Sequence, residues 1–230
     1  MKIRRIHDWD LDYGAARALQ DELAGRLVRE PLPGGVRLVA GADMAFSRRA
    51  GLFFAAVIVI DTQNMETVEV RHAVRESTFP YIPGLLSFRE GPVVLDAFAQ
   101  VENTPDAVIF DGQGIAHPRR LGLAAHVGLW LGVPTVGCAK SRLIGEHGEP
   151  GRRKGSRAEL RDGDERIGVV LRTRTDVKPV FVSPGHRADI ETSAELVLRC
   201  CTRYRLPEPT RRAHNEVGRL KRDYMERAGR

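Results

Sequence analysis

Cysteine is scarce in this sequence of 230 residues, and the few cysteines fit no common structural motif. They are Cys138, Cys200 and Cys201. They form no CxxC pair, and an odd number with two adjacent members makes a poor disulfide framework. Nor does any zinc spacing join Cys138 to the histidines at positions 117, 126 and 186. We therefore expect free thiols in a reducing compartment, the cytoplasm.

Long apolar runs are also missing. The strongest run, Leu52 to Ile60, is far too short to cross a bilayer, and the first residues lack the apolar stretch of a signal peptide. No Ser-rich linker or internal repeat interrupts the chain, whose length suits one α/β domain with a full core. We expect residues 1–230 to form a single catalytic domain without a membrane partner.

Basic residues are what the sequence has in excess. Lys and Arg outnumber Asp and Glu by 36 to 30, and the sequence pI is about 9.6. Such a charge favours a polyanion such as nucleic acid, because cations neutralise phosphates and release counterions. Many solvated surfaces are basic for no specific reason, so charge alone does not decide the partner. The candidate duplex contacts are Arg152-Arg153-Lys154, Arg211-Arg212, Arg219 and Lys221-Arg222.

Hydrophobic periodicity and chain-breaking residues outline the secondary structure. Helical spacing predicts helices at about 10–29, 86–101, 118–131, 190–201 and 209–227. Short apolar or alternating runs predict strands at about 36–45, 52–60, 67–74, 107–110, 134–138, 165–171 and 180–182, the first two as a hairpin. Two prolines make residues 79–84 a stiff loop. This order predicts an α/β fold with a mixed central sheet flanked by helices.

Three carboxylates stand where a charge needs a partner. Asp43 interrupts an apolar strand, Asp111 follows the apolar run Ala107 to Phe110, and Glu90 begins the helix after the proline loop. Each alone fits a cap, a turn or a surface charge, because burying an unpaired carboxylate is expensive. Together they predict an oxygen-ligand site for a hard cation such as Mg²⁺, and pairs of such ions cleave phosphodiesters.

Longer strings around these acids resemble the endonuclease V family. The matching strings are 41–43, 79–90, 111–119, 137–141, 183–187 and, more loosely, 209–214. They follow one another in the family's order and spacing. The resemblance implies a ribonuclease H-like fold and a monomeric endonuclease that depends on Mg²⁺, with Mn²⁺ as a substitute ion.

The resemblance also implies a substrate and an active site. The substrate is DNA containing deoxyinosine, the product of adenine deamination. Family members cut the second phosphodiester bond 3′ to the lesion and leave 3′-hydroxyl and 5′-phosphate ends. Matched residue by residue, the metal-binding and catalytic acids are Asp43, Glu90 and Asp111. Lys140 and His214 match further catalytic positions, and a lysine beside a transferring phosphoryl group stabilises its charge.

Lesion recognition maps onto the same strings. By resemblance, the strand-separating wedge is Pro80, Tyr81, Ile82 and Pro83. The base pocket is Gly84, Leu86, Gly112, Gly122, Ala139 and Leu143, and candidate phosphate contacts are His117, Arg119 and His186. Flanking prolines limit the loop's conformational freedom, and an aromatic ring can stack where a base is displaced. The alternative is that Tyr81 and Ile82 lie buried beneath a turn.

Other functions compete with this interpretation. The same scaffold could act as an inosine-specific endoribonuclease on inosine-containing RNA, or as a protein that binds altered DNA without cutting it. The four groups Asp43, Glu90, Asp111 and Lys140 argue against the binding protein. A dinucleotide-binding motif at Gly112-Gln113-Gly114 fails, because the sixth position of GxGxxG is His117.

Overall fold

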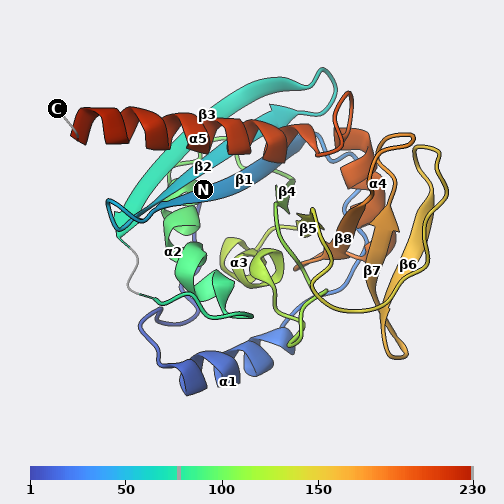
Figure 1. Cartoon of the computed structure of the whole chain (residues 1–230), viewed down its shortest axis with the longest axis horizontal. Helices are drawn as coiled ribbons and strands as arrows, with labels where there is room; N and C mark the ends of the chain where they lie inside the picture. The colour runs from blue at the N-terminus through green and yellow to red at the C-terminus, as the bar shows by residue number, and fades with distance from the viewer. Residues whose placement is uncertain (77–78, 229–230) are drawn as a thin grey trace.

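The computed structural model describes residues 1–76 and 79–228, and its central feature is an eight-stranded sheet (Figure 1). The strands are β1 Leu38–Ser47, β2 Leu52–Asp61, β3 Glu66–Glu76, β4 Ala107–Phe110, β5 Thr135–Ala139, β6 Arg157–Asp162, β7 Glu165–Leu171 and β8 Val180–Pro184. They lie in the order β3-β2-β1-β4-β5-β8-β7-β6. β1, β4 and β5 run parallel, whereas every other neighbouring pair is antiparallel. The predicted mixed sheet is therefore confirmed.

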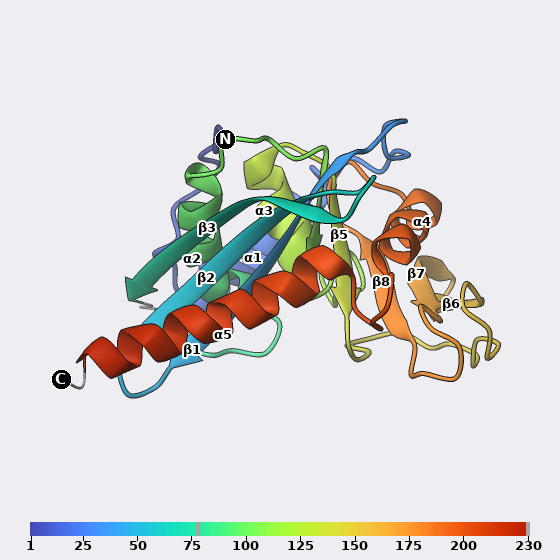
Figure 2. The ribbon, with the colours of Figure 1, turned by 90° about the horizontal axis from the view of Figure 1, so that it is seen from above.

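Helices cover both faces of this sheet (Figure 2). They are α1 Tyr13–Ala24, α2 Leu86–Ala99, α3 Leu123–Leu131, α4 Ile190–Cys200 and α5 Glu208–Ala228. Val39 packs in the cluster that holds the apolar residues of α4, and its neighbour Ala40 packs with those of α2 and α3. This alternation is expected of a strand buried on both faces. Within the described residues, no helix is long and apolar enough to cross a membrane.

Local sequence explains several helix ends. The Asp12 carboxylate accepts a hydrogen bond from the Ala15 amide at 2.8 Å and caps α1, and Asp189 caps α4 through the Thr192 amide at the same distance. α3 ends at Gly132, whose φ of 67° lies in the left-handed region that glycine adopts readily. All five helices lie where the sequence predicted them, but α1 and α3 are shorter than predicted.

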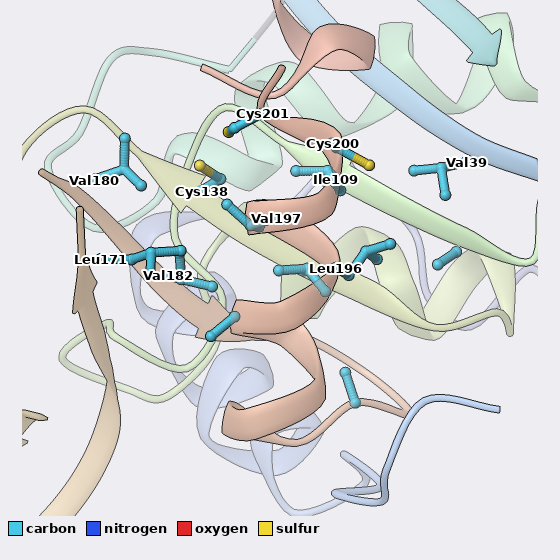
Figure 3. Close-up of a cluster of buried hydrophobic side chains, with 14 of the residues drawn as sticks. Val39, Ile109, Cys138, Leu171, Val180, Val182, Leu196, Val197, Cys200 and Cys201 are labelled. Carbon is cyan, nitrogen blue, oxygen red and sulfur yellow. The ribbon is translucent and has the colours of Figure 1, made fainter. Parts of the chain in front are cut away.

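The three cysteines are buried together between α4 and the sheet (Figure 3). All three are free thiols. Burial raises the pKa of Cys200 and of Cys201 to about 12, so both remain protonated and behave as small apolar groups. The expectation of free thiols is confirmed, and these thiols act as packing groups in the apolar core.

Two features differ from the prediction. β6 was not expected, because it is an edge strand in which Leu160 is the one fully buried side chain. The helix predicted from Pro118 begins instead at Leu123. The preceding segment folds back on a neighbouring loop, where the Gly122 amide donates to the Gly114 carbonyl at 2.9 Å. Tertiary contacts therefore outweigh local helical spacing before Leu123.

Candidate active site

The parallel register of the central strands brings distant residues to one edge of the sheet. Ala42 of β1 pairs with Phe110 of β4, so Asp43 and Asp111 each follow by one residue and lie side by side. Phe110 also pairs with Gly137 of β5, which leads to Lys140 just beyond that strand. Carboxyl ends of parallel strands are where α/β sheets commonly place their ligand-binding residues.

Glu90 joins these acids from α2, on one covered face of the sheet. Burial raises the pKa of Glu90 to about 7, and the negative charges of Asp43 and Asp111 add to the rise, while Arg89 opposes it. Burial likewise raises the pKa of Asp43; the hydrogen bond from His214 opposes this rise, and Asp111 adds to it. Asp43 and Glu90 therefore lie close enough to Asp111 for its negative charge to act on both.

A lysine and a histidine side chain contact Asp111 and Asp43. The Lys140 ammonium donates to the Asp111 carboxylate in an ion pair. His214, on α5, lies with Nδ1 2.7 Å from Oδ2 of Asp43. Asp43 lies within β1 and not at its end, so this contact supplies the partner that an acid in an apolar strand needs. The structure thus brings together all five predicted catalytic residues.

The fit of these residues to a metal ion rests on donor chemistry. Within residues 1–76 and 79–228, no three His, Cys, Asp or Glu side chains are already grouped to hold a metal. Asp43, Glu90 and Asp111 nevertheless offer the oxygen ligands that hard divalent cations prefer. Burial and the charges of Asp43 and Asp111 raise the pKa of Glu90, and a cation among these carboxylates would favour its ionised form. The donor set therefore fits Mg²⁺ once Lys140 releases the Asp111 carboxylate.

A cavity of about 410 Å³ opens beside the acids. Its lining includes Asp111 and Lys140, together with three predicted wedge residues, Tyr81, Ile82 and Pro83. All six predicted base-pocket residues also line it: Gly84, Leu86, Gly112, Gly122, Ala139 and Leu143. The candidate recognition residues therefore border the same space as two of the candidate catalytic residues, Asp111 and Lys140.

Within this lining, individual residues differ in role. Tyr81 is 68% exposed, so it does not lie buried beneath a turn, whereas Ile82 packs partly against Leu85 and Phe88. A Cβ at Gly122 would lie 2.4 Å from the Gln113 carbonyl oxygen. The absence of a side chain at Gly122 therefore serves backbone packing as well as access to the cavity.

The three predicted phosphate contacts lie in different surroundings. His117 lines the cavity but is buried, and burial with the nearby Arg119 lowers the pKa of His117 to about 4. The Arg119 guanidinium donates to the Gly84 carbonyl at 2.9 Å. His186 is buried near Thr135, which accepts a hydrogen bond from its backbone amide. Phosphate binding by these residues stays a prediction.

Sequence reasoning missed two residues at this site. The Arg89 guanidinium lies 4.7 Å from the Phe46 ring centroid and 5.9 Å from that of Tyr81, so it contacts the wedge loop through the Tyr81 ring. Its position next to Glu90 was a usable signal. Gln20 of α1 reaches Gly84 from 64 positions away, and nothing in the local pattern indicates it.

Fold and site together define a class. A mixed sheet covered on both faces, with carboxylates from adjacent parallel strands and a lysine beside a base-sized cavity, is the arrangement of a nuclease with a ribonuclease H-like fold.

Comparisons with known proteins name the family within this class. The family model Endonuclease V matches residues 21–215. Endonuclease V of Thermosipho melanesiensis is 45% identical over 226 residues, which cover 98% of this chain and 99% of that protein. The chain belongs to the endonuclease V family and is a hydrolase that acts on phosphodiester bonds.

Solved structures agree with this assignment. The crystal structure of endonuclease V from Streptomyces avermitilis superposes with a TM-score of 0.91 at 41% identity, covering 98% of this chain and all of that one. Endonuclease V of Ciona intestinalis superposes with a TM-score of 0.81 at 26% identity, covering 90% and 96%. That protein was crystallised with a 24mer DNA containing an inosine followed by a ribo-adenosine. The expected fold is thereby confirmed.

Proposed function

We propose that this enzyme repairs DNA containing deoxyinosine by hydrolysing the second phosphodiester bond 3′ to the lesion. The products are 3′-hydroxyl and 5′-phosphate ends. The observation that carries the proposal is the shared cavity, whose lining includes the wedge residues Tyr81, Ile82 and Pro83 together with Asp111 and Lys140. The inosine-containing DNA bound by the Ciona intestinalis protein supports the same substrate. The single sheet that runs through the chain supports one catalytic domain, and we propose a cytoplasmic monomer.

In the proposed mechanism, Asp43, Glu90 and Asp111 hold Mg²⁺, with Mn²⁺ as a substitute. A cation held by these residues would supply Lewis-acid charge for phosphodiester hydrolysis and would lower the pKa of a water molecule. Lys140 leaves Asp111 and places its charge beside the phosphoryl oxygens. His214 orients Asp43 through its 2.7 Å contact and is the side chain best placed to exchange a proton there.

The wedge and the pocket account for recognition. Tyr81 is exposed beside the cavity, where its ring can fill the space of a displaced base. Displacing a base costs roughly a few kcal/mol, and the cost is lowest for a poorly paired base such as inosine opposite thymine. Leu86 and Leu143, which are 39% and 52% exposed, offer apolar surfaces to the displaced base.

The test compares three substrates under Mg²⁺: a duplex with one deoxyinosine, the same duplex with deoxyadenosine, and a matched inosine-containing RNA. We expect a nick one nucleotide beyond the lesion in the first duplex alone, and no nick with Asp43→Ala. Preferential cleavage of the RNA would assign an endoribonuclease instead. Tight binding of inosine-DNA without cleavage in Mg²⁺ or Mn²⁺ would assign a binding protein.

A further inference from the structure

A buried side chain links two walls of the cavity. Gln20, on α1, is fully buried, and its Nε2 donates to the Gly84 carbonyl at 3.0 Å and to the Leu121 carbonyl at 3.3 Å. Gly84 and Leu121 both line the cavity, one from the segment after the wedge and the other from the segment before α3. Gln20 therefore spans the wall behind the candidate base pocket.

Arg119 completes this connection. Its Nε donates to Oε1 of Gln20 at 2.5 Å, and its Nη2 donates to the same Gly84 carbonyl at 2.9 Å. Both polar ends of the Gln20 amide are thus occupied, and the Gly84 carbonyl accepts two hydrogen bonds. Gly84 has a φ of 79°, a conformation that glycine adopts readily, so neighbouring contacts must hold its carbonyl in place.

The packing of α1 does not depend on this amide. Leu23 of α1 is buried in a cluster with Leu121, Ala125 and Leu129, and Leu19 packs against the same cluster. These apolar contacts hold α1 against α3 without help from Gln20. The hydrogen bonds of Gln20 can therefore serve the cavity walls more than the docking of the helix.

We propose that Gln20 is a positioning residue for lesion recognition, because it fixes the separation of the Gly84 and Leu121 walls. Guanine differs from hypoxanthine by one exocyclic 2-amino group, and a pocket excludes one extra group only if its walls cannot move apart. Loosening the walls weakens the fit of hypoxanthine and admits guanine. This inference rests on the proposed deoxyinosine activity.

The experiment uses Gln20→Leu, which keeps the volume but no polar group, and Gln20→Glu, which keeps the shape and the acceptor for Arg119 but loses both donors. The matched control is Gln100→Leu, because Gln100 Nε2 also donates to two backbone carbonyls, those of His72 and Asp96, at the end of α2. Cleavage of duplexes with deoxyinosine or deoxyguanosine at one position is measured with Mg²⁺, and KM and kcat are determined separately.

We expect both Gln20 variants to lose about tenfold in the ratio of kcat/KM for deoxyinosine over deoxyguanosine. The loss lies mainly in KM for the inosine duplex. Gln100→Leu keeps the ratio of the unsubstituted enzyme. Both substrates are cut by the same sample, so partial unfolding cancels in the ratio, and Gln20→Glu provides the test if Gln20→Leu does not fold.

Two results would overturn the inference in distinguishable ways. An unchanged ratio in the Gln20 variants, with an enzyme that prefers deoxyinosine, removes the role of Gln20 alone. Absence of that preference in the unsubstituted enzyme removes the proposed function as well.

Discussion

At the scale of single residues, Glu90 carries a conflict between stability and function. The carboxylate is largely buried beside Asp43 and Asp111, which together with burial raises its pKa to about 7. An acid whose pKa is higher in the folded protein than in the unfolded chain destabilises the fold progressively as the pH rises from the unfolded pKa to the folded pKa. The site retains this charge because a cation ligand must be ionised.

Replacing Glu90 by glutamine should therefore stabilise the protein while abolishing cleavage. The glutamine keeps the shape and removes the buried charge, so we expect a gain of about 1–3 kcal/mol in the free energy of unfolding at pH 8 without divalent cations. Urea denaturation at pH 8 and pH 5 measures the gain, which should be much smaller at the lower pH because the folded carboxyl is then protonated. Glu195→Gln, on the exposed face of α4, is the control and should change neither property. Equal stability of Glu90→Gln and the unsubstituted protein at pH 8 would show that the charge is not costly.

His117 should make the fold sensitive to acid. Burial lowers the pKa of His117 from 6.5 to about 4. Between these two pH values, His117 is protonated in the unfolded chain but neutral in the folded protein. The stability due to His117 is complete above pH 6.5 and falls with pH until about pH 4, by about 3 kcal/mol in all. Glu90 acts in the opposite direction between pH 7 and pH 4.5.

The contribution of His117 is isolated by comparing His117→Gln with the unsubstituted protein across pH 4 to 7.5. The variant should lose less stability on acidification, and the two unfolding curves should converge as the pH falls. Parallel curves would mean that His117 is protonated equally in the folded and unfolded states.

At the scale of elements, the central strands were predictable and explain most of the site. The run Ala107 to Phe110 is apolar throughout because β4 is buried on both faces, and this places Asp111 at its end. The proline loop likewise marks the segment before α2. Where a strand or loop carries its own signal, the residues beside it could be assigned to the site.

Contacts between distant segments explain what the sequence could not indicate. The sequence indicated that Asp43 lies either near a strand end or beside a positive group. The structure places it within β1, where His214 from α5 is its partner. Gln20 lies in an ordinary amphipathic helix, and only the folded chain shows that its amide meets Gly84. No local periodicity contains this information.

The packing of α5 on β1 offers a test at this scale. A Cβ at Gly41 would lie 2.2 Å from the backbone carbon of Pro209, in the first turn of α5. We expect Gly41→Ala to displace this turn and destabilise the protein by roughly 1–3 kcal/mol. The rate of cleavage should fall by more than partial unfolding can explain, because His214 lies on the same helix and loses its contact with Asp43.

Thermal unfolding and cleavage of the inosine duplex are compared with Gly148→Ala as control. No atom lies within 4 Å of a Cβ at Gly148, so that variant should match the unsubstituted protein. If Gly41→Ala were fully active at a temperature where it is folded, catalysis would not depend on the position of α5.

At the scale of the whole molecule, much of the positive charge already has partners within the protein. Arg211 and Arg212 both pair with Glu208, which is 4% exposed. These two arginines therefore neutralise a buried acid at the start of α5, which weakens their candidacy as free duplex contacts. Among the candidate duplex contacts in the described part of the chain, the side chains of Arg153 and Arg222 are exposed and make neither an ion pair nor a hydrogen bond, whereas Lys154 donates to the Cys201 carbonyl.

Arg153 and Arg222 are accordingly the candidates for phosphate contacts remote from the lesion. Each phosphate contact contributes about 0.9 to the slope of log affinity against log salt concentration. Replacing both residues by alanine should lower that slope by about 1 to 2 and weaken binding to inosine-containing and undamaged duplexes equally. Binding of a noncleavable duplex is measured over a salt series without divalent cations. Arg26→Ala is the control, because Arg26 already pairs with Glu22 on α1. A loss restricted to inosine-containing DNA would instead place these arginines in lesion recognition, because contacts to phosphate alone cannot distinguish one base from another.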